Sequence, residues 1–201
     1  MLTYQLLTKD QVADIYHNHM KQDFPPAEVK PLLLIQQLVD RGVYQPYGWY
    51  NEAGNLIAYS FFVKAPEGSV LLMDYFAVCR EYRNSGYGSR CLEQMKTLWR
   101  GVSGILAEVE DPAKSSSEEE AHTRTRRVAF YQRNGLRPTR VHSVLFGVPY
   151  ILHYLSIEEE CTDENLNLEL DSIYRTLFPL PVYEAKAHIT LQESEAQRLE
   201  V

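Results

Sequence analysis

The stretch REYRNSGYGSR, residues 80–90, is the most informative part of the chain. It follows the apolar run VLLMDYFAV (70–78), which has the composition of a buried strand, and it precedes a segment whose apolar residues recur at helical spacing. A glycine-rich turn between a strand and a helix presents free backbone N–H groups at the positive end of the helix dipole. The stretch therefore predicts an anion-binding site, which Gly86 and Gly88 allow the backbone to approach closely.

Two common phosphate-binding loops do not match this stretch. A Walker loop requires Gly-Lys-Ser/Thr, whereas Gly88 is followed by Ser89 and Arg90. A dinucleotide-binding fingerprint requires a third glycine where this chain has Cys91, and three segments typical of antiparallel strands precede the loop. The pattern that does match is Arg-x-x-Gly-x-Gly, present as RNSGYG from Arg83 onward.

Hydrophobic periodicity and turn residues place the other elements. The first predicted strand is LTYQLL (2–7), and VYQPYGWY (43–50) and NLIAYSFFVK (55–64) are predicted to form a hairpin. Further strands are predicted at 70–78 and at GILAEVE (104–110), followed by an antiparallel pair at 136–148 and 149–157. The predicted helices cover 8–20, 31–42, 91–99 and 123–135, and a mobile loop at 111–122 runs into the last of them. This order predicts a mixed α/β fold with a largely antiparallel sheet flanked by helices.

The chain is expected to divide into a domain at 1–158 and a C-terminal extension at 159–201. The extension contains an amphipathic helix at 163–178, ended by Pro179, and a polar tail of about twenty residues that is expected to be partly disordered. The apolar stripe of that helix is formed by Leu166, Leu170, Ile173, Tyr174 and Leu177. This apolar stripe must be buried against another surface. By default the helix packs on the chain's own domain, and the alternatives are that it covers a dimer interface or the acceptor cleft.

Composition excludes several classes of protein. The 201 residues are 45% hydrophobic and 23% charged, with a formal net charge of -7, which argues against a nucleic-acid partner and favours cationic small molecules or basic peptides. No apolar run reaches the ~18 residues of a membrane span, and no signal peptide is recognised, so we expect a cytoplasmic protein. The three cysteines and six histidines show no disulfide or metal-binding spacing, so no metal is expected.

Two segments together resemble one known family. YFAVCREYRNSGYGSRCLEQM (75–95) looks like the pyrophosphate-binding segment of the GNAT superfamily of acyl-CoA-dependent N-acyltransferases, and RVAFYQRNGL (127–136) looks like its second signature. The predicted strand order is similar as well, and the resemblance covers roughly residues 1–157. It implies a GNAT-like fold in which the central strands splay apart between Val78 and Gly104, with acetyl-CoA as co-substrate.

The resemblance also implies how the cofactor is held. The backbone of Phe76, Ala77 and Val78 would pair with the pantetheine arm. The pyrophosphate would be held by Ser89 and by the backbone amides of the loop that precedes it. The residues of this loop are Arg83, Asn84, Ser85, Gly86, Tyr87 and Gly88. The acyl thioester would lie where the central strands separate.

Acyl transfer to an amine requires three groups. A base must remove a proton from the ammonium form, an N–H must stabilise the oxyanion, and an acid must protonate the departing thiolate. From the resemblance, the Val78 N–H would serve the oxyanion and Tyr131 would be the acid, unless Tyr131 only packs on the cofactor. Glu108 is the first candidate for the base, because burial of a carboxylate in an apolar strand raises its pKa. Asp74 and Glu110 are the other two candidate carboxylates. In the alternative interpretation, these carboxylates only bind a cationic substrate, or Glu110 faces water at the end of its strand. The resemblance also allows ordered water to take the place of a single base.

The acceptor pocket is expected to involve Asp74, Glu110, Phe24 and Trp49. Trp49 lies in a stretch with Tyr44, Tyr47 and Tyr50, which can form an aromatic cage for an ammonium group, although alternation also places half of these rings in the core. Three arginines, Arg124, Arg126 and Arg127, either reach the nucleotide phosphates or lie on a solvated helix face.

We therefore expect an N-acetyltransferase that passes the acetyl group of acetyl-CoA directly to a primary amine of a small amine or amino-acid-like metabolite. Two alternatives remain open: a protein or peptide N-acetyltransferase, and a non-catalytic coenzyme A-binding regulatory module. The sequence does not name the acceptor, because one fold can serve many substrates.

Overall fold

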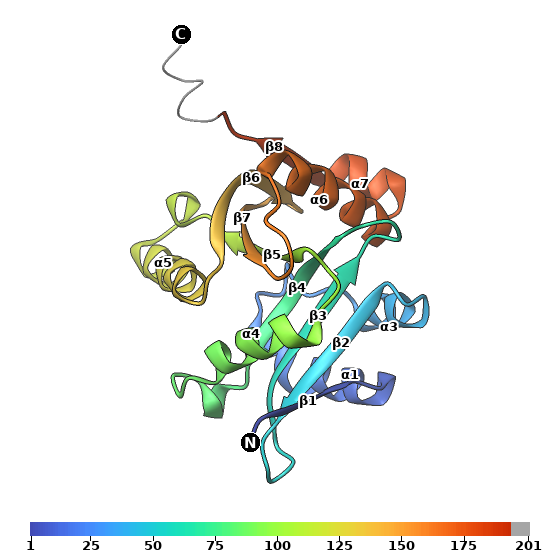
Figure 1. The fold of residues 1–201 in the computed structure, drawn as a ribbon, viewed down its shortest axis with the longest axis vertical. Coiled ribbons are helices and arrows are strands. Elements are labelled where there is room, and N and C mark those ends of the chain that lie inside the picture. The colour runs from blue at the N-terminus through green and yellow to red at the C-terminus, as the bar shows by residue number, and fades with distance from the viewer. Residues whose placement is uncertain (194–201) are drawn as a thin grey trace. The chain divides into compact units, whose positions relative to one another are not determined.

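The computed structural model describes residues 1–193, which form two compact units. The first unit consists of Met1–Lys64 and Met73–Leu98, and the second consists of Ala65–Leu72 and the chain from Trp99 onward. Strand β4 (Val70–Val78) contributes residues to both (Figure 1). This division differs from the expected boundary near residue 158, since residues 159–193 belong to the second unit.

The strands of the first unit follow the order β1-β2-β3-β4. They are β1 (Thr3–Leu6), β2 (Tyr44–Tyr50), β3 (Leu56–Lys64) and the last part of β4. β1 pairs antiparallel with β2, and β2 pairs antiparallel with β3, with a shift in register between Trp49 and Tyr50. The predicted hairpin is thus confirmed.

The first unit contains three longer helices and shorter helical turns. They are α1 (Lys9–Ile15), the π-helical turn η1 (Tyr16–Met20), α2 (Lys21–Asp23), α3 (Leu32–Asp40), the 3-10 turn η2 (Arg80–Tyr82) and α4 (Tyr87–Leu98). Helix α1 begins with a capping box, in which the Gln11 N–H donates to Thr8 Oγ1 at 3.3 Å and the Thr8 N–H donates to the Gln11 side chain at 2.9 Å. Helix α4 packs on β3, and α3 packs on β2.

The strands of the second unit follow the order β5-β7-β6-β8, and every pair is antiparallel. They are β5 (Gly104–Glu110), β6 (Arg137–Leu145), β7 (Val148–Ser156) and β8 (Ala187–Leu191). Gly104 is required at the start of β5, because a Cβ atom there would lie 2.3 Å from the carbonyl oxygen of Leu155 and 2.5 Å from the ring of Tyr154.

The helices of the second unit lie on opposite sides of these strands (Figure 1). They are the 3-10 turn η3 (Pro112–Lys114), α5 (Glu118–Arg133), α6 (Asp163–Leu177) and α7 (Leu180–Lys186). Helix α5 packs on β5 and β6, whereas α6 packs on β6 and β8. The two helices therefore bring side chains to different faces of the same strands.

Helix α5 begins at Glu118, earlier than the predicted start at residue 123. The segment 111–122 was predicted as a mobile loop, but it forms η3 and the first turn of α5. Ser117 caps the helix by accepting a hydrogen bond from the Glu120 N–H at 3.2 Å, and the glutamates of the first turn interact favourably with the helix dipole. The run of like charges that suggested a loop is thus a favourable helix start.

The predicted polar tail is only partly correct. Residues 180–191 form α7 and β8, and β8 extends the sheet by pairing with β6 from Val141↔Leu191 to Leu145↔Ala187. The remainder of the predicted tail, 194–201, lies outside the described residues. The apolar stripe of α6 is buried within its own unit, so the extension is an integral part of that unit.

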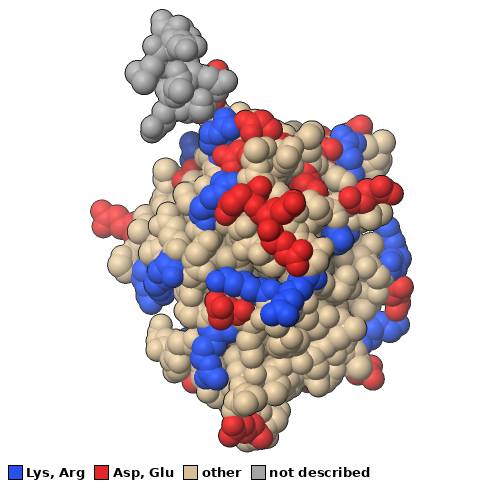
Figure 2. Space-filling model, in the orientation of Figure 1, with Lys and Arg blue, Asp and Glu red and all other residues tan. Residues whose placement is uncertain are grey.

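The visible surface carries both signs of charge. Figure 2 shows Lys and Arg side chains interspersed with Asp and Glu side chains on this face. Within residues 1–193, none of the helices combines the length and the apolar composition that a membrane crossing requires.

The burial of α6 generates a stability prediction. Leu170 is fully buried, whereas Leu168 on the same helix is 68% exposed. We expect Leu170→Ala to lower the free energy of unfolding by about 2–5 kcal/mol, because the truncation leaves a cavity. Leu168→Ala is the matched control and should change it by less than about 0.5 kcal/mol. Urea unfolding of both variants measures the difference, and equal values would show that α6 does not pack as described.

Candidate active site

The predicted anion-binding loop joins β4 to α4. Asn84 and Gly86 have φ values of 61° and 79°, so the backbone turns twice through the left-handed region before α4 begins at Tyr87. Asparagine and glycine are the residues that adopt this region most readily. The loop from Arg83 to Gly86 is exposed, and the first N–H groups of α4 have no acceptor within the helix. This geometry suits a ligand with closely spaced anionic oxygens, such as a diphosphate.

The Arg83 side chain holds the loop in place. Its Nε donates to the carbonyl oxygen of Val78 at 2.9 Å, and its Nη2 donates to Asp23 Oδ1 at 2.6 Å. The Asp23 side chain is only 1% exposed, and it also accepts a hydrogen bond from the Tyr59 hydroxyl at 2.9 Å. Burial and the Asp23 carboxylate raise the pKa of Tyr59, so this hydroxyl stays a donor. Binding of the pyrophosphate by the Arg83 backbone amide stays a prediction, whereas the Arg83 guanidinium stabilises the loop.

The end of β4 carries the residues expected to contact the pantetheine arm. Phe76, Ala77 and Val78 are each half-buried. The Cys79 N–H that follows donates to the carbonyl oxygen of Ile57 on β3 at 2.9 Å, which fixes the strand end. The roles predicted for Phe76, Ala77 and the Val78 N–H remain predictions.

Asp74 has a partner that the sequence analysis did not anticipate. The Lys30 ammonium lies 2.9 and 3.1 Å from the two Asp74 oxygens and 5.1 Å from the centroid of the Tyr75 ring, and the Tyr44 hydroxyl donates to Asp74. The side chains of Asp74 and Lys30 are 5% and 12% exposed. The carboxylate predicted to bind a cationic acceptor is therefore already paired with a cation of the chain.

The aromatic cage predicted near the hairpin is not formed as expected. Trp49 and Tyr44 are buried in the core, where the Trp49 ring lies 6.5 Å from that of Phe76. The two residues are five positions apart on β2, so their rings point to opposite faces of the strand, and each face is covered. Phe24 is half-buried, and its ring lies 5.1 Å from the Tyr75 ring, so it remains on the side of the first unit where an acceptor was expected.

Tyr131 lies in the last turn of α5 and is almost fully buried. Its carbonyl oxygen accepts from the Leu136 N–H at 3.1 Å, just beyond the left-handed Gly135 that ends the helix. Burial raises the pKa of the Tyr131 phenol, so the hydroxyl is protonated and can donate. Its ring lies 6.5 Å from that of His153, and burial lowers the pKa of His153, so this imidazole is neutral.

Glu108 lies on the face of β5 that α6 covers. The Tyr174 hydroxyl of α6 donates to Glu108 Oε1, and Ser143 Oγ of β6 lies 3.4 Å from the same oxygen. Burial and the Glu108 carboxylate raise the pKa of Tyr174 well above its usual value. Tyr174 was expected only as a member of the apolar stripe, because helical spacing reveals that a ring is buried but not what its hydroxyl contacts.

Glu110, the last residue of β5, forms ion pairs with two arginines of α5. Arg124 Nη2 lies 3.0 Å from its Oε1, and Arg127 Nη1 contacts its Oε2. Arg124 also donates to Glu120 at 2.6 Å. Arg124 and Arg127 thus pair with Glu110, whereas one expectation was that they contact the nucleotide phosphates. Arg126 is exposed, in agreement with the other expectation, a solvated helix face. Glu110 is therefore paired with cations of its own chain, and its predicted contact with the acceptor stays a prediction.

The described residues also show how possible metal-ligating and thiol side chains are placed. Residues 1–193 contain no group of three or more His, Cys, Asp or Glu that could hold a metal ion. Cys79 and Cys91 are buried, and burial raises the pKa of each thiol to about 12. A thiol with such a pKa is not a nucleophile at neutral pH.

Comparison with known proteins identifies the class. A model of the Acetyltransferase (GNAT) family matches residues 11–136, more than half of the chain, and the chain therefore belongs to the GNAT acetyltransferase family. This confirms the resemblance and the mixed α/β fold expected from the sequence. None of the curated proteins matches the chain significantly.

Solved structures with the same fold include several acetyltransferases. One is a GNAT-family acetyltransferase from Bacteroides thetaiotaomicron, with a TM-score of 0.63 and 22% identity over 81% of this chain and 89% of that chain. Another is the ribosomal-protein-S18-alanine N-acetyltransferase of Escherichia coli, with a TM-score of 0.56 and 16% identity over 80% and 97%. A third is the spermidine N-acetyltransferase of Vibrio cholerae in complex with CoA and spermine, with a TM-score of 0.56 and 11% identity over 79% and 96%. At these identities the likeness shows the fold alone.

Proposed function

We propose that this protein is an acetyl-CoA-dependent N-acetyltransferase of the cytoplasm that acts on the primary amine of a small amine or amino-acid-like metabolite. The observation that carries the proposal is the left-handed turn at Asn84 and Gly86 that leads into α4. A turn of this kind before a helix start supports the proposal, because the unpaired N–H groups of a first helical turn can donate to a diphosphate, and the chain belongs to the GNAT family.

The loop would hold the pyrophosphate of acetyl-CoA through the amides from Arg83 to Gly88 and through Ser89. The contact of Arg83 with Asp23 keeps the loop in this conformation before the ligand arrives, which lowers the entropy lost on binding. The end of β4 would receive the pantetheine arm along Phe76, Ala77 and Val78, and the Val78 N–H would stabilise the oxyanion.

In this proposal Glu108 accepts the proton that the acceptor ammonium must lose. An alkylammonium has a pKa of ~10.4, so most molecules are protonated at neutral pH. The free amine then attacks the thioester carbonyl carbon, a C–N bond forms, and the C–S bond breaks with the electron pair leaving on sulfur. The nitrogen loses its second proton to water, and exchange with water restores the proton that Tyr131 gives to the sulfur and removes the one that Glu108 took. No covalent intermediate on the protein is needed.

Tyr131 would donate its phenolic proton to the departing thiolate. The register pairs Glu108 with Leu152 and Ala107 with His153, so Glu108 and the His153 ring that Tyr131 approaches lie on opposite faces of β5 and β7. Because the nitrogen and the sulfur are bonded to the same carbon in the tetrahedral intermediate, the proposal requires the thioester to lie at an edge of β5, within reach of both faces.

A small amine is favoured as acceptor by the net charge of -7 and by the half-buried carboxylate of Glu108. Similar structures belong to enzymes named for spermidine. A protein substrate is the second candidate, since another similar structure is named for acetylation of a ribosomal protein alanine. A non-catalytic coenzyme A-binding module would bind the cofactor without turnover.

Incubation of the protein with acetyl-CoA and a panel of acceptors tests the activity directly. The panel contains spermidine, lysine, alanine and a peptide that begins with alanine, and free coenzyme A thiol and acetylated products are both measured. We expect acetylation of at least one small amine. Acetylation of the peptide alone would favour the second candidate, and cofactor binding without product would contradict catalysis.

The conformation of the loop predicts the effect of replacing Gly86. Gly86→Val should weaken acetyl-CoA binding by at least about tenfold, because a β-branched residue resists the left-handed conformation and the N–H groups lose their arrangement. The matched control is Gly54→Val. Gly54 has a similar φ of 80° and equally open surroundings, but it lies in the turn between β2 and β3. Calorimetric titration should show an affinity within about twofold of the original for the control.

Equal weakening in both variants would mean that general destabilisation, and not the loop, determines acetyl-CoA affinity. Unchanged affinity in Gly86→Val would remove the pyrophosphate assignment.

The acid role of Tyr131 predicts a selective loss of turnover. Tyr131→Phe should lower kcat by about 10–100-fold, while the affinity for acetyl-CoA stays within about twofold, because the ring remains and only the proton donor is lost. Since burial raises the pKa of Tyr131, the unchanged protein should keep this activity up to at least pH 9. Steady-state kinetics against pH measures both effects. Equal kcat in the variant would show that Tyr131 only packs.

A further inference from the structure

The environment of Glu108 raises the question of what holds its carboxylate. Glu108 interrupts an apolar strand, with Ala107 and Val109 on either side and Leu152 opposite on β7. A half-buried carboxylate in such surroundings requires hydrogen-bond donors. Two elements provide them: the Tyr174 hydroxyl comes from α6, and Ser143 Oγ comes from β6.

The two hydroxyls form a compact group around one oxygen of the carboxylate. The Tyr174 oxygen and Ser143 Oγ lie 3.0 Å apart, and both contact Glu108 Oε1. Tyr174 is fully buried and Ser143 is 2% exposed. Because burial and the Glu108 carboxylate raise the pKa of Tyr174 well above its usual value, its hydroxyl is protonated at neutral pH and can donate to Glu108.

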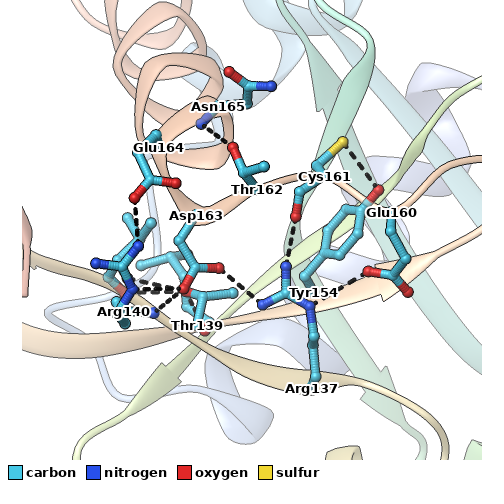
Figure 3. A network of polar contacts seen from close by, with 12 residues as sticks. Arg137, Thr139, Arg140, Tyr154, Glu160, Cys161, Thr162, Asp163, Glu164 and Asn165 are labelled. Atoms are coloured by element: carbon cyan, nitrogen blue, oxygen red, sulfur yellow. Dashed lines mark hydrogen bonds and ion pairs between the residues drawn. The ribbon is translucent and has the colours of Figure 1, made fainter. Parts of the chain in front are cut away.

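The helix that carries Tyr174 is itself firmly held. Figure 3 shows its N-terminal end, where Arg137 Nη1 and the Arg140 N–H donate to Asp163 at 2.8 and 3.0 Å. Thr162 caps the helix by accepting from the Asn165 N–H at 3.3 Å. Farther along, Glu169 accepts hydrogen bonds from the N–H and the hydroxyl of Ser69 at 2.9 and 2.8 Å. Tyr174 thus extends from a helix with contacts along its length.

We propose that the C-terminal helix α6 is part of the catalytic apparatus, and that Tyr174, assisted by Ser143, is a positioning residue for Glu108. The inference rests on the proposed function, in which Glu108 takes the proton of the acceptor amine. The Tyr174 hydroxyl restricts the rotation of the carboxylate, and a hydrogen bond to a carboxylate favours its charged form, so the contact orients Glu108 for the ammonium group. The extension that the sequence separates from the domain therefore completes its site.

The charged and titratable groups near Glu108 determine how the test must be designed. Within the second unit, Tyr174 faces Glu108 from α6, and Tyr150 of β7 is close enough to affect Tyr174. Glu110 lies two residues along the same strand, where Arg124 and Arg127 pair with it. Ser143 and Leu152 contribute no charge. Removing the Tyr174 hydroxyl therefore changes the donors at Glu108 and leaves these ion pairs in place.

The test compares Tyr174→Phe with Tyr183→Phe. The Tyr183 hydroxyl also donates to a carboxylate, that of Asp171 on the outer part of α6, so the control removes the same kind of bond elsewhere on the helix. The pH dependence of kcat/KM is measured for each variant with the best acceptor of the panel. Because the acceptor is the same throughout, its own ionisation contributes equally to every profile.

In Tyr174→Phe we expect the acidic limb of the kcat/KM profile, where the rate falls at low pH, to shift to higher pH by about one unit. The reason is that a carboxylate that loses a hydrogen-bond donor is protonated more easily. The plateau of kcat should fall about tenfold with the KM for acetyl-CoA nearly unchanged, because the carboxylate is less well oriented. Tyr183→Phe should keep the original limb and plateau. Ser143→Ala should move the limb in the same direction by a smaller amount, and it provides the test if Tyr174→Phe does not fold.

An acidic limb that stays in place in both Tyr174→Phe and Ser143→Ala would overturn the positioning role while leaving the acetyltransferase activity intact. Glu108→Gln distinguishes the other failure. If it keeps the full rate and the original limb, Glu108 is not the base, and the proposed mechanism fails together with this inference. If the unchanged protein acetylates none of the acceptors, the proposed function itself fails.

Discussion

The structure depends on ion pairs and hydrogen bonds that stabilise its buried carboxylates. Asp23, Asp74 and Glu110 have side chains that are 1%, 5% and 11% exposed, and each is paired with Lys or Arg side chains of its own unit. Glu108 is half-buried and receives the hydroxyls of Tyr174 and Ser143. A buried carboxylate without such partners would cost several kcal/mol. These contacts join segments far apart in the sequence, and they account for much of the arrangement within each unit.

In the first unit, these pairs organise the surroundings of the anion-binding loop. Asp23 lies at the end of α2, and through it Arg83 connects the helical segment before residue 24 to the loop after β4. Lys30 and Asp74 connect the segment before α3 to the middle of β4. The loop conformation at Gly86 is therefore supported from outside the loop. In the second unit, Glu110 connects β5 to α5, and Glu108 connects β5 to α6, so the helix expected as part of an extension is joined to the central strands of its unit.

Features encoded by adjacent residues were predictable, and features that depend on distant contacts were not. The capping box at Thr8, the hairpin of β2 and β3, and the turn at Gly86 all follow from local patterns, and the structure has each of them. The start of α5 was missed because a run of glutamates is typical both of a solvated loop and of a first helical turn. The pairs Lys30–Asp74 and Tyr174–Glu108 span 44 and 66 residues, and no periodicity in the sequence reveals them.

The proposed binding of the acetyl-CoA pyrophosphate by the loop at residues 83–88 can be measured by calorimetric titration of the unchanged protein with acetyl-CoA, with coenzyme A and NAD as comparisons. We expect binding of both coenzyme A species and no binding of NAD, because the turn matches a GNAT loop and lacks the third glycine of a dinucleotide site. If the protein binds neither acetyl-CoA nor coenzyme A, the loop is only a structural turn, and the proposed pyrophosphate site is wrong.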